Sequence, residues 1–187
     1  MRFTFQKPGT MLNPVPVVMV TCADGDVRDV VTVAWAGTVC SDPPMVSISV
    51  RPERFSNPII TKSGVFVINL VNEELARDCD WCGVTSGRDV DKFAARNLRA
   101  TPGPVTGVPM LDASPVCLEC RVKEILHPGS HDIFLAEIAA VHADDRYMDE
   151  KGIFHLENAG LIAYSHGKYQ KLGDVLGTFG FSVRKKP

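Results

Sequence analysis

The sequence predicts a mainly β protein, an antiparallel barrel with a few short inserted helices. Short runs rich in β-branched residues dominate the chain, and hairpin turn signals separate them. No G-x-G-x-x-G motif opens a helix after a strand. These observations favour a barrel over a βαβ dinucleotide-binding unit, so a dinucleotide would have to bind in another way.

Bulk properties indicate a single soluble domain spanning residues 1–187. Hydrophobic residues make up 45% and charged residues 22% of the chain. The net charge of -2 provides no electrostatic footprint for nucleic acid. No apolar run approaches the roughly 20 residues needed to span a bilayer. Because the N-terminus also lacks a signal-peptide core, we expect a cytoplasmic protein without membrane contact.

In the first half of the chain, an Asp24-Gly25 turn is expected to join two strands as a hairpin. The nearly all-apolar segment Val65–Val71 predicts a central strand buried on both faces, in which Asn69 needs a polar partner. Ala36–Pro44 is expected to be a tight crossing between strands. The elements expected here are strands at Val15–Ala23, Val30–Trp35, Met45–Val50 and Val65–Val71, and helices at Pro58–Lys62 and Glu73–Cys82, the latter capped by Asn72.

The second half predicts one more short helix and the rest of the barrel. Thr101–Pro109, which contains three prolines, is expected to be irregular. Apolar residues in Leu172–Ser182 need a surface to cover, and a partner subunit is one candidate. The remaining elements expected are a helix at Asp89–Arg96 and strands at Val116–Leu126, Asp132–His142, Leu161–Tyr164 and Tyr169–Leu172, the last two closing the sheet.

One stretch, Val30–Asn57, carries the strongest functional signal. Small residues flank Trp35 and leave the backbone open to a flat molecule. Arg54 and Ser56 then stand at a helix start suited to an anion. In Met45–Val50, alternation places two serine hydroxyls on one face. A flat platform followed by an anion cradle indicates a phosphorylated ring cofactor, and the alternative is a buried hairpin followed by a capped helix.

The six cysteines favour free thiols over disulfides in a chain without a secretion signal. Two Cys-x-x-Cys pairs, at residues 79–82 and 117–120, imitate a zinc-ribbon spacing. The second pair falls in an expected strand, where positions three apart point to opposite faces. We therefore expect no metal site, and we interpret Cys40 and Cys82 as small buried apolar residues.

An ordered set of motifs resembles the FMN-binding split-barrel flavoproteins, specifically the flavin reductase-like, flavoredoxin-type family. The resemblance spans nearly the whole chain, and each motif alone is weak. The matching segments are TVAWAG (Thr32–Gly37), DPPMVSISV (Asp42–Val50), RPERFS (Arg51–Ser56), SGVFVIN (Ser63–Asn69), WCGVTSGRDVDKF (Trp81–Phe93), GSHDIFLAE (Gly129–Glu137) and GFS (Gly180–Ser182).

The resemblance implies a split, Greek-key-like barrel that binds FMN non-covalently near a homodimer interface. The ring would lie along a platform formed by Val33, Ala34, Trp35, Ala36, Gly37 and Thr38, beside Ser49 and Val50. The phosphate would meet Arg54, Ser56, Asn57, Arg88 and Lys92. Asn69, Tyr164 and Cys40 are further candidates near the cofactor. Structural alternatives are that Lys92 and Arg88 are solvated charges and that Trp35 belongs to the core.

His131 aligns with a histidine that the wider flavin reductases carry near the nicotinamide, and its alternative is an ordinary turn residue. The resemblance implies an oxidoreductase in which FMN takes hydride from NADH or NADPH and passes electrons to an acceptor. The alternative is a flavoredoxin-type electron carrier that meets a redox partner protein and uses no nicotinamide. A third possibility is a non-catalytic FMN or haem module, although the five histidines form no evident haem motif.

Overall fold

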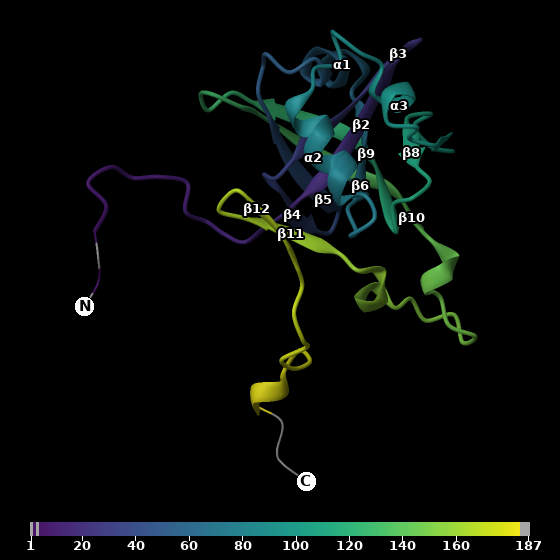
Figure 1. Cartoon of the computed structure of the whole chain (residues 1–187). Helices are drawn as coiled ribbons and strands as arrows, with labels where there is room; N and C mark the ends of the chain where they lie inside the picture. Colours follow the sequence, from purple (N-terminus) through teal and green to yellow (C-terminus); the bar gives the residue numbers. More distant parts are fainter. Residues whose placement is uncertain (1, 3, 184–187) are drawn as a thin grey trace.

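A seven-stranded antiparallel sheet forms the centre of the computed structural model, which describes residue 2 and residues 4–183 (Figure 1). Its strand order is β3-β2-β6-β9-β10-β5-β4, and each neighbouring pair is antiparallel. The strands are β2 (Val18–Asp24), β3 (Val27–Val33), β4 (Ala36–Ser41), β5 (Pro44–Val50), β6 (Val65–Leu70), β9 (Val116–Leu126) and β10 (Asp132–Ala143). The predicted mainly β, antiparallel class is confirmed.

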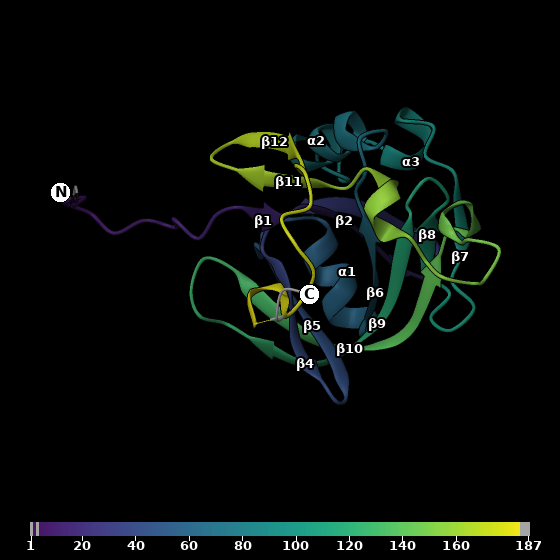
Figure 2. The same ribbon diagram turned by 90° about the horizontal axis from the view of Figure 1, so that it is seen from below.

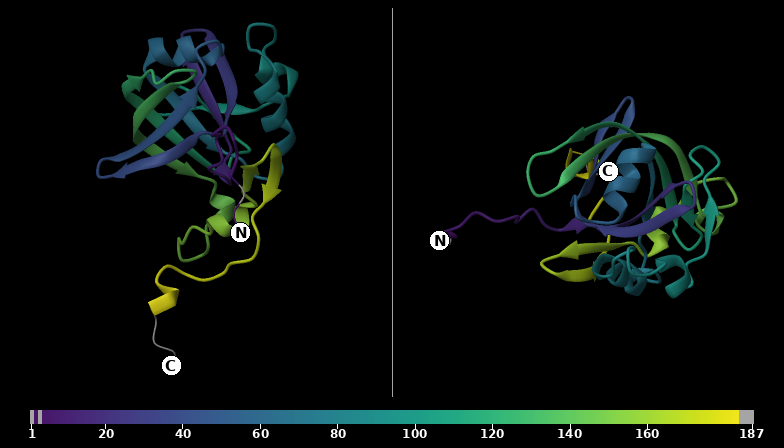
Figure 3. Two further views of the ribbon diagram at one scale, coloured as in Figure 1. Left: turned by 90° about the vertical axis from the view of Figure 1, so that its left-hand side faces the viewer. Right: turned by 90° about the horizontal axis from the view of Figure 1, so that it is seen from above.

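The sheet curls into a barrel, and helix α1 (Ser56–Ser63) lies at one end of it. In the right-hand view of Figure 3, which shows the molecule from above, α1 lies within the ring of strands. It packs against β2 and β3. Where β3 passes into β4, the Ser49 amide donates to the Trp35 carbonyl at 2.9 Å. The turn that follows β5 and the start of α1 are thereby held close to Trp35.

The two largest buried clusters of the described residues lie on the two sides of the sheet, and a third, small one contains Val67, Val108 and Cys117. The barrel interior contains Ile48, Phe66 and Phe134, all fully buried. A second cluster, which includes Met19, packs between the sheet and helix α2 (Ala76–Val84). The predicted alternation in β5 is confirmed, because Val46, Ile48 and Val50 are buried while the two serines between them are half-buried. β6 is buried on both faces as predicted, and its Asn69 amide donates to the Met19 carbonyl at 2.9 Å.

Residues at turns and helix ends explain which predicted hairpin and helix boundaries agree with the structure. β2 and β3 form the predicted hairpin, with Gly25 at φ 59°. α1 ends at the predicted place because Gly64 adopts the left-handed conformation and donates to the Ile60 carbonyl. α2 begins three residues later than predicted, since Asn72 caps the preceding turn by accepting from the Leu75 amide at 3.1 Å. The third helix expected from the sequence, Asp89–Arg96, is shortened to α3 (Lys92–Ala95), with Asp91 as its N-cap.

Three predictions about strands are wrong. Ala36–Pro44 is not a crossing, because it contains edge strand β4, which pairs with β5. Both faces of β4 are largely exposed, so its sequence shows no alternation of apolar and polar residues. Thr101–Pro109 is not irregular throughout, because β7 (Ala100–Pro102) pairs with β8 (Pro109–Leu111). Strands β11 (Ile162–Ser165) and β12 (Lys168–Lys171) do not close the main sheet. They join β1 (Val15–Pro16) in a separate three-stranded sheet, seen in Figure 2.

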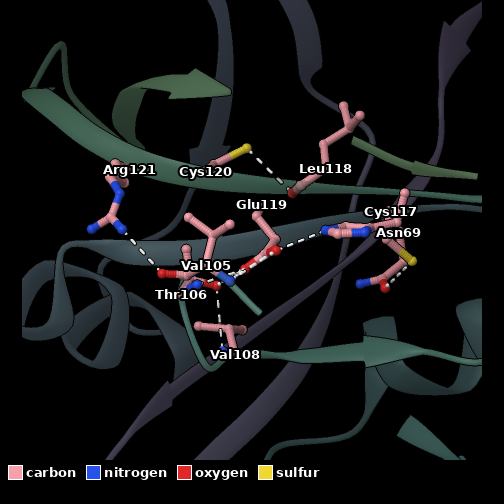
Figure 4. Close-up of polar contacts among 10 residues, drawn as sticks. Asn69, Val105, Thr106, Val108, Cys117, Leu118, Glu119, Cys120 and Arg121 are labelled. Carbon is pink, nitrogen blue, oxygen red and sulfur yellow. Dashed lines mark hydrogen bonds and ion pairs between the residues drawn. The ribbon is translucent and has the colours of Figure 1, made fainter. Parts of the chain in front are cut away.

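The fully buried carboxylate of Glu119, on β9, holds the loop between β7 and β8 (Figure 4). It accepts from the Val105 amide at 3.1 Å and from the Thr106 amide and hydroxyl at 2.6 Å each. His142 Nε2 lies 2.7 Å from its other oxygen. A Cβ at Gly103 would collide with this carboxylate, so the loop requires glycine there.

The two ends of the chain extend from the barrel (Figure 1). Three short 3₁₀ helices, Asp145–Tyr147, Leu156–Ala159 and Phe181–Val183, lie in the C-terminal quarter. Among the described residues, no helix is both long enough and apolar enough to cross a membrane.

Candidate functional site

Three adjoining cavities form a groove that begins at α1 and ends beneath the N-terminal segment. The basic cavity, of about 460 Å³, is lined by Asp29, Val31, Arg51, Glu53, Arg54, Phe55, Ser56, Thr85, Ser86, Gly87, Arg88 and Lys92. The inner cavity, of about 240 Å³, is lined by Val31, Thr32, Val33, Ala34, Trp35, Ser49, Val50, Arg51, Arg54, His131 and Tyr164. The outer cavity, of about 750 Å³, is lined by Gly9, Thr10, Met11, Leu12, Val15, Ala34, Trp35, Ala36, Gly37, Ser47 and Ser49.

Shared walls make the three cavities continuous. The basic and inner cavities have Arg51 and Arg54 in common, and the inner and outer cavities have Trp35 and Ser49 in common. The hairpin β4–β5 and the start of α1 supply most of these residues. Segments far apart in the sequence, from residue 9 to residue 164, thus converge on one groove.

At the basic cavity, helix α1 begins with Ser56, whose side chain is fully buried. Its hydroxyl has no hydrogen-bond partner among the described residues. Buried polar atoms in native proteins are almost always paired, so an orphaned hydroxyl in a cavity wall indicates a missing ligand. The start of an α-helix also favours negative charge, which makes this wall of the cavity suited to an anion.

A buried ion pair, Asp29 with Lys92, lies in the same cavity. Lys92 Nζ is 3.2 Å from Asp29 Oδ1 and donates to the carbonyls of Val30 at 2.7 Å and Cys82 at 3.2 Å. Lys92 thus donates hydrogen bonds to two carbonyls and contacts Asp29 as an ion pair. Despite the ionic contact, Asp29 Oδ1 has no aligned hydrogen-bond donor. Burial raises the pKa of the Asp29 carboxyl above its usual range, and the charge of Lys92 offsets this only in part.

The arginines of the basic cavity differ in how far they are engaged. Arg88 donates to the Glu53 carbonyl at 2.7 Å, and Arg51 contacts the Glu53 carboxylate at 3.3 Å. The half-buried guanidinium of Arg54, in contrast, makes no hydrogen bond or ion pair with any described residue. It is close enough to Asp29 to favour the ionised carboxylate electrostatically. Arg54 is therefore the cation most available to an anionic ligand.

At Gly87, the backbone of the loop after α2 lies close to the Asp29 carboxylate and the Phe55 ring. A Cβ at this position would lie 2.5 Å from Asp29 Oδ1 and 2.6 Å from the Phe55 ring. Only glycine lets the loop after α2 approach so closely. Residues 85–88 of this loop form part of the cavity wall.

The inner cavity is lined by residues 31–35 and by the ring of His131, which contacts the ring of Trp35. The rings of Trp35 and His131 are 4.6 Å apart between centroids and tilted by 46°. Partial burial and the nearby charge of Arg51 lower the pKa of His131, which favours the neutral imidazole. Ser130 Oγ lies 2.9 Å from His131 Nδ1. The cavity thus has aromatic walls and one neutral, hydrogen-bonding ring.

Most of the residues predicted from the sequence lie in this groove. The basic cavity holds Arg54, Ser56, Arg88 and Lys92, the inner cavity holds Val33, Ala34, Trp35, Ser49, Val50, His131 and Tyr164, and the outer cavity adds Ala36 and Gly37. Sequence reasoning missed Asp29, Phe55 and Gly87. A charged residue within the apolar strand Val27–Val33 was the available signal for Asp29.

Four predicted residues line none of the three cavities. The Asn57 amide donates to Asp132 at 2.8 Å and is buried beneath β5. The Asn69 carbonyl oxygen accepts from the Leu111 amide at 2.8 Å. Thr38 and Cys40 lie farther along β4, where the Cys40 thiol donates to the Asp42 carbonyl at 3.4 Å. The side chains of Asn57 and Asn69 thus have protein partners.

Comparison with known proteins gives consistent matches. Residues 10–173 match the model of the family described as "Flavin reductase like domain". An uncharacterised protein of Aeropyrum pernix is 29% identical over 167 residues, which is 88% of this chain but only 62% of that relative. The chain therefore spans less than two thirds of that protein. NADH:riboflavin 5'-phosphate oxidoreductase of Streptomyces pristinaespiralis is 28% identical over 135 residues, covering 72% of this chain and 73% of the relative.

Among solved structures, flavoredoxin of Desulfovibrio vulgaris (Miyazaki F) superposes with a TM-score of 0.89 at 24% identity. The match covers 98% of this chain and all of that one. Such a similarity establishes a common fold. Since the family model spans most of the chain, the protein belongs to the flavin reductase-like family.

Proposed function

We propose that the protein is an FMN-containing oxidoreductase that takes hydride from NADH or NADPH onto non-covalently bound FMN and passes the electrons to an acceptor. One observation carries this proposal. Two buried polar atoms of residues that line the basic cavity have unmet hydrogen-bonding capacity: Ser56 Oγ has no partner among the described residues, and Asp29 Oδ1 has only its ion pair with Lys92 at 3.2 Å. A ligand that satisfies both must offer an acceptor to the first and a donor to the second.

FMN offers both kinds of group. Its phosphate oxygens would accept from the Ser56 hydroxyl and the Arg54 guanidinium, and a ribityl hydroxyl would donate to Asp29. Four cationic side chains and two acidic ones line the cavity, so the balance favours an anion. Lys92, whose donors are already engaged, would act as a fixed charge that stabilises ionised Asp29 rather than as a direct ligand.

The ring system would lie in the inner cavity, against backbone from Val31 to Trp35. When bound, FMN supplies the hydride-accepting and electron-transferring chemistry, while the protein supplies orientation and solvent access. Trp35 and His131 limit access to the ring from one side. The rest of this cavity is lined by Ser49, Val50, Arg51, Arg54 and Tyr164.

We expect Arg54→Ala to weaken FMN binding about ten- to a hundred-fold, because it removes one charge-assisted contact worth roughly 1.5–3 kcal/mol. Titration of the apo-protein by flavin fluorescence quenching measures this. Arg99→Ala, which removes an exposed arginine outside the groove, is the matched control and should leave affinity unchanged. If both variants bind FMN like the wild type, the phosphate lies elsewhere.

His131→Ala should slow reduction by nicotinamide while FMN stays bound. Hydride transfer needs donor and acceptor atoms roughly 3–3.5 Å apart, so it depends on a well-shaped stacking site. Anaerobic stopped-flow mixing with NADH and with NADPH follows the loss of flavin absorbance. Reduction at the wild-type rate would remove His131 from the nicotinamide site.

A second candidate function is that of an electron carrier acting with a redox partner protein. The fold shared with a flavoredoxin supports this candidate. The same mixing experiment separates the two functions. If dithionite reduces the bound flavin but neither nicotinamide does so within minutes, the carrier function replaces the reductase.

We also propose a homodimer. In the C-terminal segment, Val175 is 77% and Leu176 93% exposed, and Phe181 is 60% exposed. This segment extends away from the barrel (Figure 1). A partner subunit would bury these side chains, with a gain of roughly 25 cal/mol per Å² of apolar surface. We expect light scattering at micromolar concentration to give twice the chain mass, and a monomer mass would contradict the proposal.

A further inference from the structure

The basic cavity has a buried end and an exposed rim. The buried end contains three residues whose exposed fractions are 3% or less, Asp29, Ser56 and Lys92. The rim is formed by three exposed residues, Arg51, Glu53 and Arg88. Arg51 also lines the inner cavity, so the two cavities adjoin beside the rim. A ligand with a phosphate at Ser56 and a ring in the inner cavity would have to cross the rim in order to extend any further.

Two hydrogen-bonded turns carry the rim. Residues 51–54 form a turn in which the last amide donates to the first carbonyl at 3.0 Å, and Pro52 occupies the second position, which proline favours. Residues 86–89 form another turn, closed in the same way at 3.2 Å. Glu53 and Arg88 each occupy the third position of their turn. Both residues are therefore held by backbone that is already hydrogen-bonded.

One side chain joins the two turns. The Arg88 guanidinium donates to the Glu53 carbonyl at 2.7 Å, and its central carbon lies 5.9 Å from the centroid of the Phe55 ring. The neighbouring Gly87 is so close to Phe55 that a Cβ there would lie 2.6 Å from the ring. Because the turns are in contact at these points, a further group on the ligand could pass between them only after the bond between Arg88 and Glu53 has opened.

We propose that the bond between Arg88 and the Glu53 carbonyl makes this site specific for a flavin that ends at its phosphate. This inference rests on the proposed function. FMN ends in a phosphate monoester, whereas in FAD one oxygen of the same phosphate is joined to a second phosphate and adenosine. With the FAD ring in the inner cavity, this extension would have to pass between the two turns. FMN binds with the bond closed, and FAD binds only at the cost of opening it.

The direction of one change separates this role from a direct contact with phosphate. If Arg88 bound or attracted the phosphate, Arg88→Ala would weaken FMN and FAD alike. If Arg88 closes the rim, the same variant should bind FAD more tightly, because opening the rim no longer breaks a charge-assisted hydrogen bond. We expect a gain of about tenfold in FAD affinity and a loss of less than about threefold in FMN affinity, since contacts at exposed sites contribute little.

Calorimetric titration of the apo-protein with FMN and with FAD measures both affinities. The wild type should bind FMN at least about tenfold more tightly than FAD. Arg51→Ala is the matched control, because it removes an arginine from the same rim and leaves the bond between Arg88 and Glu53 in place. The loss of this positive charge should weaken both flavins, and it should not tighten the binding of FAD.

Equal affinity of the wild type for FMN and FAD overturns the proposal, and so does unchanged or weaker FAD binding in Arg88→Ala. Tighter FAD binding in Arg51→Ala overturns it too, since loosening of the rim in general would then explain the effect.

Ribose 5-phosphate and ADP-ribose separate this proposal from the proposed function, because they differ in the same way as FMN and FAD but lack the flavin ring. If no flavin binds, yet the wild type binds ribose 5-phosphate and only Arg88→Ala binds ADP-ribose, the proposed function alone fails. If none of the four ligands binds, both fail.

Discussion

Lys92→Ala should lower the free energy of unfolding by about 3–5 kcal/mol, the cost of breaking a buried ion pair from one side. Both partners are almost fully buried, with side-chain exposures of 3% for Lys92 and 2% for Asp29. Without the ammonium, Asp29 remains buried with only the more distant charge of Arg54 near it, and the Val30 and Cys82 carbonyls lose their donor. Urea denaturation monitored by circular dichroism measures the change.

A double-mutant cycle provides the control. Asp29→Asn alone and Lys92→Met alone each remove one charge, and the two together remove both charges at nearly constant volume. We expect the double variant to be more stable than Lys92→Met alone. A loss below about 1 kcal/mol in Lys92→Ala would show that the pair behaves like an exposed one.

Glu119→Gln should cost about 1–3 kcal/mol of stability, since an amide cannot accept all the hydrogen bonds that the carboxylate receives. Thr106 alone donates twice to Glu119, from its amide and its hydroxyl. Burial opposes ionisation, but the hydrogen bonds from Thr106 and His142 outweigh it and hold the pKa of Glu119 below its usual range. Glu119 holds the β7–β8 loop together with Arg121, whose guanidinium donates to the Val105 carbonyl at 3.0 Å.

The direction of this pKa shift fixes the pH dependence. A carboxylate whose pKa is lower in the folded state stabilises the fold above its unfolded pKa. This contribution is lost as the pH falls through the folded value. Wild-type stability should therefore fall more steeply than that of Glu119→Gln below the usual glutamate range, measured by urea midpoints at successive pH values. Parallel curves for the two proteins would contradict the assignment.

Local sequence chemistry predicted much of the fold. The Asp24-Gly25 hairpin, the end of α1 at Gly64 and the central strand β6 follow from turn propensity and apolar runs, so they could be predicted. Edge strand β4 could not, because neither of its faces is fully buried and no alternation marks it. The separate sheet formed by β1, β11 and β12 depends on long-range pairing, which local patterns do not encode.

The candidate site was predictable where it is continuous in sequence. Trp35, Arg54 and Ser56 come from a single stretch and converge as expected. Asp29 was missed because its importance arises from Lys92, which lies 63 positions away in the chain and reaches it only in the folded state. Asn69 was predicted to lie near the cofactor because it belongs to a matching motif. Its side-chain amide instead forms hydrogen bonds that link β6 to β2 and β8.

The central claim is that the basic cavity holds the phosphate of a bound FMN. Titration of the apo-protein with FMN and with riboflavin, which lacks only the phosphate, tests it most directly. Several charge-assisted hydrogen bonds of roughly 1.5–3 kcal/mol each should make FMN bind at least about a hundredfold more tightly. Flavin released from the purified protein should also be FMN rather than FAD. Equal affinity for FMN and riboflavin, or binding of neither, would contradict the account.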